Sequence, residues 1–144
     1  MSTIIRTASA RRTDMRAEAE RAGIDEAFIE TLVDTFYARV RGDAELGPVF
    51  ERAIADDWDA HLATMKRFWA SVALGAGGYS GRPIPAHHKH LPHIQPAHFE
   101  RWLAVFRATL DDISPSAEAR DFFMERAKRI GARFQTILFS QAQL

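Results

Sequence analysis

Hydrophobic residues recur at every third or fourth position through most of this chain, which is the spacing of one face of an α-helix. The first such segment covers residues 25–42, between an aspartate suited to cap a helix and a glycine suited to end one. A second follows "DDW" at residues 56–58, a third begins at Pro96, and a fourth begins at Ser114 and Pro115. The alternation of apolar and polar residues that marks β-strands occurs nowhere. We therefore predict an all-α domain whose helices pack at angles set by their side-chain ridges.

Three stretches interrupt the helical pattern. The chain is expected to turn at Gly47 and Pro48, within "DAELGPVF". The stretch "LGAGGYSGRP", residues 74–83, holds four glycines and one proline in ten residues and predicts a loop. After it, prolines leave room for only one or two helical turns, over residues 85–90.

The length of 144 residues suits one domain with a core large enough to fold without disulfides. Residues 8–22 have the pattern of a short, weakly amphipathic helix. We assign residues 1–23 to an N-terminal extension, partly helical or frayed, and residues 24–144 to a single domain.

Composition excludes several classes of function. The 19 basic and 19 acidic side chains cancel, so no net field attracts nucleic acid or an anionic membrane surface. Cysteine is absent, so any metal must be held by nitrogen or oxygen ligands. No apolar run approaches the ~20 residues of a membrane span, and the N-terminus lacks a signal-peptide core. We expect a soluble, cytoplasmic protein.

Five of the six histidines lie within "PAHHKHLPHIQPAH", residues 85–98. Their spacing lacks the two separated ligand pairs of a closed zinc site, and no carboxylate lies among them. A surface histidine patch and a dedicated zinc or nickel site remain as interpretations. Haem iron, by contrast, takes four nitrogens from its porphyrin and needs only one imidazole from the protein. That chemistry suits a run with one ligand and several bystanders.

Two polar residues lie on helix faces that are otherwise apolar: Tyr37 in the first helix and His61 in the second. A histidine in such a stripe is more often a hydrogen-bonded core residue than a ligand. Here, however, the apolar faces also carry several large aromatic side chains that together could line a cofactor pocket. These are Phe36, Phe68, Trp69, Trp102 and Phe106.

Four ordered blocks between about Ile24 and Leu138 resemble the truncated haemoglobins, specifically group III. "FYARVRGDAELGPVF" is similar to the second-helix signature of that family and "DDWDAHLATMKRFW" to its distal helix. "GYSGRPIPAH" is similar to the approach to the proximal ligand and "FERWLAVF" to the next helix. The resemblance implies a globin-like, truncated 2-on-2 helical sandwich around haem b.

The same resemblance implies roles for individual residues. Tyr37 matches the distal tyrosine, His61 the distal-helix histidine and Trp69 the tryptophan of "FW". Trp102 matches the tryptophan that faces the bound ligand. His87, in "GRPIPAH", matches the proximal ligand of the iron.

The choice of proximal ligand depends on the anchor used for counting. Counting forward from "GRP" selects His87, whereas counting backward from "LP" selects His88, because this chain is one residue longer between those anchors. His90 ranks third, and His93 and His98 are expected to face solvent. Nothing in the sequence selects a partner for the haem propionates, for which Arg82, Lys89 and Arg101 are the nearest basic residues.

Three hypotheses for function follow. The first is a haem protein that reversibly binds oxygen, nitric oxide or another diatomic gas at iron held by His87. In it Tyr37 and Trp102 donate hydrogen bonds to the ligand, and His61 either donates as well or swings as a gate. The second is a haem enzyme that turns over nitric oxide or peroxide with an electron-donating reductase as partner. The third is a haem-free helical interaction module.

Overall fold

The computed structural model describes residues 8–75 and 94–140. Their regular elements are α1 (Ala8–Ala22), α2 (Glu26–Gly42), α3 (Leu46–Ile54), α4 (Trp58–Leu74), α6 (Pro96–Ile113) and α7 (Ala117–Ser140). No strand occurs within these two ranges, and the all-α prediction is confirmed.

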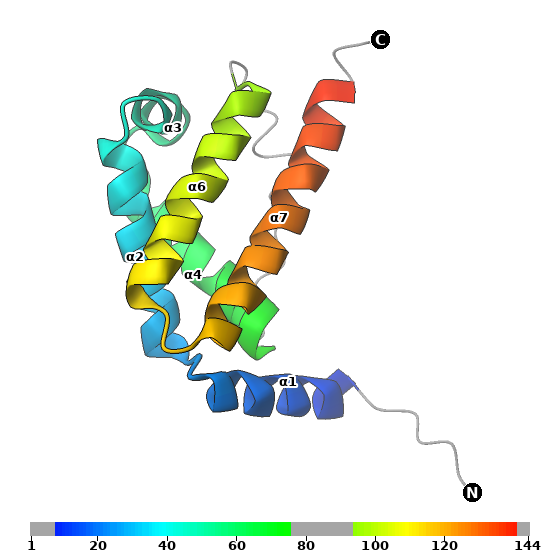
Figure 1. Cartoon of the computed structure of the whole chain (residues 1–144). Helices are drawn as coiled ribbons and strands as arrows, with labels where there is room; N and C mark the ends of the chain where they lie inside the picture. Colours follow the sequence, from blue (N-terminus) through cyan, green and yellow to red (C-terminus); the bar gives the residue numbers. More distant parts are fainter. Residues whose placement is uncertain (1–7, 76–93, 141–144) are drawn as a thin grey trace, which may run out of the picture.

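Four of the helices form two crossed pairs. Helix α2 packs against α4 and helix α6 against α7, while contacts between α2 and α6 join the pairs. Figure 1 shows α6 and α7 side by side, with α4 behind them. This arrangement is the 2-on-2 sandwich that the resemblance to the truncated haemoglobins implied.

The four long predicted helices lie where their apolar stripes indicated. Asp25 caps α2, because its Oδ1 accepts a hydrogen bond from the backbone N–H of Phe28 at 2.8 Å. One face of α2 is buried along its whole length, and it meets Phe106, Leu110 and Phe123 from the other pair in a common core. The buried residues of that face are Ile29, Leu32, Val33, Phe36, Tyr37 and Val40.

The turn expected at Gly47 and Pro48 is wrong, because both residues lie inside the first turn of α3. The chain turns earlier, at Asp43, whose Oδ1 accepts the backbone N–H groups of Glu45 and Leu46 at 2.9 Å each. Proline is tolerated in a first helical turn since its missing N–H would have no intrahelical acceptor there. The Asp43 carboxylate, three residues before the first residue of α3, therefore sets the direction of this helix.

Helix α1 covers the residues for which a helix was expected, and lies across one end of the sandwich against α4 and α7 (Figure 1). Its end is tied to α7, because Ser116 Oγ donates to the carbonyl oxygen of Ala22 at 2.7 Å. Its middle approaches the end of α4 closely. A Cβ on Gly75, which has a φ of +67°, would lie 3.0 Å from the Cβ of Arg12.

Candidate functional site

Tyr37 and His61 come from different helices and meet edge to face. Their ring centroids lie 5.0 Å apart with an interplanar angle of 89°. Tyr37 is on the buried face of α2 and only 4% exposed, whereas His61 is on the second turn of α4 and partly exposed. The Nε2 atom of His61 is nonetheless buried. This imidazole therefore lies at the boundary between solvent and the interior.

Burial determines the protonation of Tyr37. It raises the pKa of the phenol well above the ordinary value of 10.0, because a phenolate would lose its hydration in the core. The side chain is therefore a neutral hydroxyl at neutral pH, able to donate one hydrogen bond.

The five aromatic residues singled out in the sequence form one connected cluster. Phe36 meets Trp102 (5.9 Å, 81°) and Phe106 (5.0 Å, 88°) in edge-to-face contacts. Phe106 in turn lies nearly parallel to Trp102 and to Trp69, at 5.8 Å and 5.6 Å. Phe68 joins through Trp69 at 5.2 Å. We call these five residues the aromatic cluster.

The aromatic cluster adjoins the Tyr37–His61 pair through the contact of Phe36 with Tyr37, whose ring centroids lie 4.9 Å apart. Helices α2, α4 and α6 all contribute to the combined site. All seven residues predicted for it that the structure describes are thus in one continuous group of rings.

Sequence reasoning missed Trp58, which belongs to the same group of rings. Its ring lies 6.0 Å from that of His61 and 6.1 Å from that of Tyr37. Trp58 is 6% exposed and precedes His61 by three residues on α4, which places both on one helix face. That spacing was the signal that could have found it. We call Tyr37, Trp58 and His61 the polar corner.

Most of the clustered histidines lie outside the described residues. These are His87, His88, His90 and His93, and the basic residues Arg82 and Lys89 lie there as well. The exception is His98, for which exposure to solvent was expected. It is partly buried and structural, because its Nδ1 accepts the backbone N–H of Gln95 at 2.9 Å and so holds the start of α6.

Arg101 is engaged in an ion pair. Its Nε and Nη2 donate to Asp43 Oδ2 at 2.8 Å and 2.7 Å, and the Asp43 side chain is 6% exposed. The bond from Arg101 is the main cause that holds the pKa of Asp43 below its ordinary value of 3.8, with help from the two backbone N–H groups at the start of α3. The pair ties the α2–α3 corner to the helix that carries Trp102.

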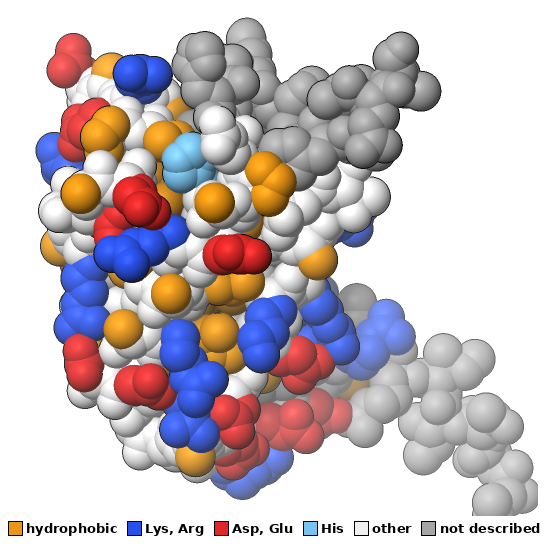
Figure 2. Space-filling view, turned by 45° about the horizontal axis from the view of Figure 1, so that its top comes forward, with side chains coloured by type: hydrophobic (Ala, Val, Ile, Leu, Met, Phe, Trp, Pro, Cys, Tyr) orange, Lys and Arg blue, Asp and Glu red, His pale blue; other side chains and the backbone are white. Residues whose placement is uncertain are grey.

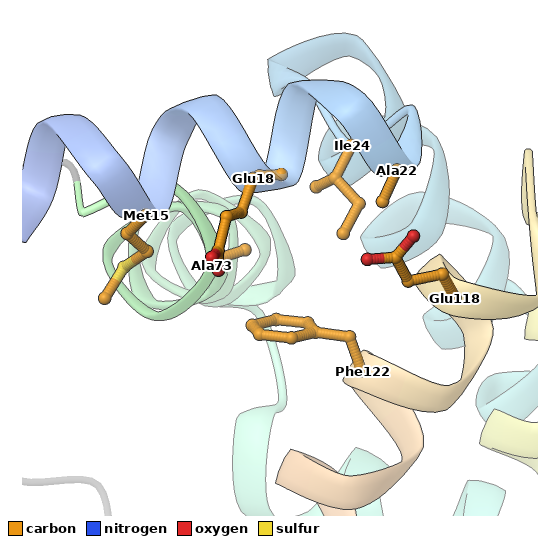
Figure 3. A pocket seen from close by; sticks show the side chains of 8 residues that line it. Met15, Glu18, Ala22, Ile24, Ala73, Glu118 and Phe122 are labelled. Carbon is orange, nitrogen blue, oxygen red and sulfur yellow. The ribbon is translucent and has the colours of Figure 1, made fainter.

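Two further searches of the described residues bear on the site. No three histidine or acidic side chains in 8–75 and 94–140 are grouped so that they could hold a metal ion. A hollow of about 80 Å³ lies instead at the far end of α4, beneath α1 (Figure 3), with Met15, Ile24 and Phe122 among its lining residues. None of the predicted site residues lines it.

Neither the surface charge nor the hydrophobicity of the described helices points to a nucleic-acid or membrane site. Basic and acidic side chains are interspersed over the face shown in Figure 2, with no broad area of one sign. None of the helices that the structure describes is both long and apolar enough to cross a membrane.

Comparison with known proteins identifies the family. The model of the bacterial-like globins matches residues 20–136. Over 119 residues the chain is 36% identical to the group 3 truncated hemoglobin ctb of Campylobacter jejuni. This alignment covers 81% of this chain and 92% of the relative. The crystal structure of a group III truncated hemoglobin from Campylobacter jejuni superimposes with a TM-score of 0.74 at 35% identity, covering 81% of this chain and 92% of that one. The chain is a group III truncated haemoglobin.

Globins bind haem, and the residues of this truncated haemoglobin fit that group. Large apolar side chains on α4 and α6 remain only partly buried in the polypeptide although they pack on the core, and a flat apolar molecule beside them would complete their burial. They are Leu62, Met65, Phe68, Trp102 and Leu103. The polar corner supplies a neutral hydroxyl and an imidazole next to this apolar surface.

Proposed function

We propose that this truncated haemoglobin carries haem b and reversibly binds oxygen, with nitric oxide as a further diatomic ligand, at an iron held by His87 alone. The observation that carries the proposal is the buried Tyr37 hydroxyl beside His61, at the edge of the aromatic cluster. Among aromatic rings a hydroxyl donor meets little competition from water. Donation to a small polar ligand gives this placement a purpose.

When bound, haem supplies an iron with one coordination position open to a gas. The protein contributes the donors around that position. Tyr37 keeps its proton because burial raises the pKa of its phenol, so its hydroxyl donates to a ligand that carries partial negative charge. Trp102, whose indole is part of the same ring group, is the second donor that we assign. Both act more strongly in a dry pocket than in water.

His61 has two uses that follow from its position. Its buried Nε2 is on the inner side, where it can donate to the ligand, and its ring is partly exposed, where it can move aside to admit one. Either use requires that the orientation of the imidazole be controlled by its neighbours.

We assign the iron to the neutral Nε2 of His87, with Nδ1 expected to donate to an acceptor that would fix the ring. His88 is the alternative. The test is haem retention by His87→Ala and His88→Ala, each serving as the matched control of the other. We expect wild type and His88→Ala to take up one hemin per chain with the spectrum of a histidine-ligated globin, and His87→Ala to lose it on a desalting column. The opposite result would assign the iron to His88, and failure of the folded wild type to bind hemin would end the proposal.

A second candidate function is a haem redox enzyme that oxidises nitric oxide or turns over peroxide with electrons from a reductase. It is supported by His61, since a ring that reaches from solvent to Tyr37 can carry protons to the pocket. Steady-state consumption of nitric oxide or peroxide with a reductase, compared with that of free hemin, separates the enzyme from the carrier. A cytoplasmic location is part of the proposal and is tested by cell fractionation. The globin family gives no support to the haem-free interaction module.

A further inference from the structure

The first turn of α4 contains a residue that the proposed function does not use. Trp58 is buried against both functional residues of the polar corner, with ring centroids 6.0 Å from His61 at 88° and 6.1 Å from Tyr37 at 64°. The three centroids form a triangle with sides of 5.0, 6.0 and 6.1 Å, so the imidazole of His61 contacts both Tyr37 from α2 and Trp58 from its own helix. A rotation of His61 would therefore change its contacts with both rings.

No hydrogen bond holds Trp58 in place within the part of the chain that the structure describes. Its Nε1 is buried and has no acceptor among those residues. A buried indole N–H ordinarily has an acceptor, which fixes the plane of the ring. The orientation of Trp58 thus depends on packing and on whatever lies over its ring face.

Arg41 lies over that face. Its Cζ is 4.4 Å from the centroid of the Trp58 ring, which is the geometry of a cation–π interaction. Its Nε donates to Glu51 Oε1 at 3.0 Å, and both of these charged side chains are about half exposed. A series of contacts therefore runs from an ion pair at the surface, through the ring of Trp58, to His61.

We propose that Trp58, held by Arg41, is a positioning residue that sets the orientation of His61 and so controls how fast a diatomic ligand enters the site. The effect on ligand entry rests on the proposed function, whereas the contacts of Trp58 with Arg41 and His61 do not. Helices α2 and α3 supply the charged pair and α4 supplies both rings. Removing the contact of Arg41 with Trp58 should let the His61 imidazole reorient while the aromatic cluster stays unchanged.

The molecule offers a matched control. Arg126 lies over the ring of Phe122, with its Cζ 4.9 Å from the centroid, and its Nη1 is 3.7 Å from Glu125 Oε1. Both arginines thus combine a cation–π contact with an ion pair, but Arg126 is on α7, whereas the polar corner is formed by α2 and α4. Arg41→Gln and Arg126→Gln remove the same charge and the same kind of interaction at two different places.

The experiment compares Arg41→Gln, Trp58→Phe and Arg126→Gln with wild type, using carbon monoxide as the probe. Its association rate with the haem-loaded protein is measured after flash photolysis. The ¹³C resonance of the His61 ring is recorded in the full chain with and without haem. Arg41→Gln is a surface change that should fold normally, so the test survives if Trp58→Phe does not fold.

We expect Arg41→Gln to speed association about two- to five-fold, which corresponds to the strength of an exposed cation–π contact, and to shift the His61 resonance. Trp58→Phe should do both more strongly, and Arg126→Gln should do neither. If Arg41→Gln and Trp58→Phe leave the rate and the resonance as in wild type, or if Arg126→Gln changes them equally, the proposal is overturned. If wild type binds no haem, the proposed function fails, while the resonance in the haem-free chain still decides whether Trp58 positions His61.

Discussion

The two ends of helix α4 are built on similar contacts and differ in what they bury. At its start, Trp58 lies beneath Arg41, and at its end Ala73 adjoins Phe122, which lies beneath Arg126. The start buries polar atoms, among them the Tyr37 phenol and the Nε2 of His61.

The polar groups at the end of α4 are of a different kind. The carboxylates of Glu18 and Glu118, which line the hollow beneath α1 in Figure 3, belong to exposed residues. Solvated carboxylates cost nothing to keep, whereas buried polar atoms lose hydration free energy. The start of α4 is therefore where we expect ligand chemistry, and the end is where we expect only packing.

Of the substitutions that test this difference between the two ends of α4, we expect Tyr37→Phe to have the largest effect. In Tyr37→Phe the ring and its contacts remain but the hydrogen-bond donor is lost. Oxygen should therefore dissociate about 10- to 100-fold faster, which corresponds to the free energy of one hydrogen bond to a charged partner. Stopped-flow displacement of oxygen by carbon monoxide measures the rate. Stability should change little, because the edge-to-face contacts with Phe36 and His61 are kept. An unaltered dissociation rate would remove Tyr37 from the ligand site.

At the other end of α4 the expected effect is on stability alone. Gly75 has a φ of +67°, and a Cβ there would lie 3.0 Å from the Cβ and Cγ of Arg12. Gly75→Ala should therefore lower the free energy of unfolding by about 1–3 kcal/mol, as measured in urea, while the kinetics of oxygen and carbon monoxide stay unchanged.

Gly42→Ala is the matched control for that change. Nothing lies within 4 Å of a Cβ at Gly42, and its φ is not positive, so the same substitution should be neutral or slightly stabilising. Equal tolerance of alanine at both glycines would show that α1 does not press on the end of α4.

A smaller effect is expected at Asp43, which is near the polar corner in the sequence but acts on structure. Asp43→Asn keeps the shape of the side chain but loses the charge that holds Arg101 and the start of α3. It should cost about 1 kcal/mol at neutral pH, with ligand kinetics unaltered. Asp112→Asn, which breaks the more exposed pair with Arg39, should cost less.

The contribution of Asp43 also depends on pH. Because the folded-state pKa of Asp43 is lower than its ordinary value of 3.8, the contribution is complete above that value and is lost as the pH falls through the folded-state pKa. Acid unfolding curves of wild type and Asp43→Asn should therefore converge below about pH 4. Curves that stay parallel down to the lowest pH would show that the charge of Asp43 does not stabilise the fold.

These cases also show what sequence reasoning could and could not reach. The four long helices were predictable because each has an apolar stripe longer than two turns, and Asp25 caps the first as its residue type suggested. Helix α3 was missed because glycine and proline signal a turn equally well just before a helix and within its first turn. Only the contacts of Asp43, which depend on folded geometry, decide between the two.

The site followed the same rule. Tyr37, His61 and the aromatic cluster could be singled out because polar and aromatic residues on an apolar stripe stand out in the sequence, and the structure brings their rings together. Trp58 was overlooked because a tryptophan in a first turn resembles ordinary core, and its contacts with Arg41 and Tyr37, both on α2, depend on how α2 and α4 pack. His87 and His88 could not be separated, since adjacent histidines offer the same chemistry and counting from the two flanking motifs gives different answers.

The smallest expected effect tests whether the hollow beneath α1 has any role. Glu18→Gln and Glu118→Gln remove its two carboxylates without changing its shape. Because both residues are exposed, each variant should stay within about 0.5 kcal/mol of wild-type stability in urea and show wild-type oxygen and carbon monoxide kinetics. Ligand kinetics altered by either variant would mean that the end of α4 communicates with its start, and that burial of polar atoms does not by itself locate the function of this globin.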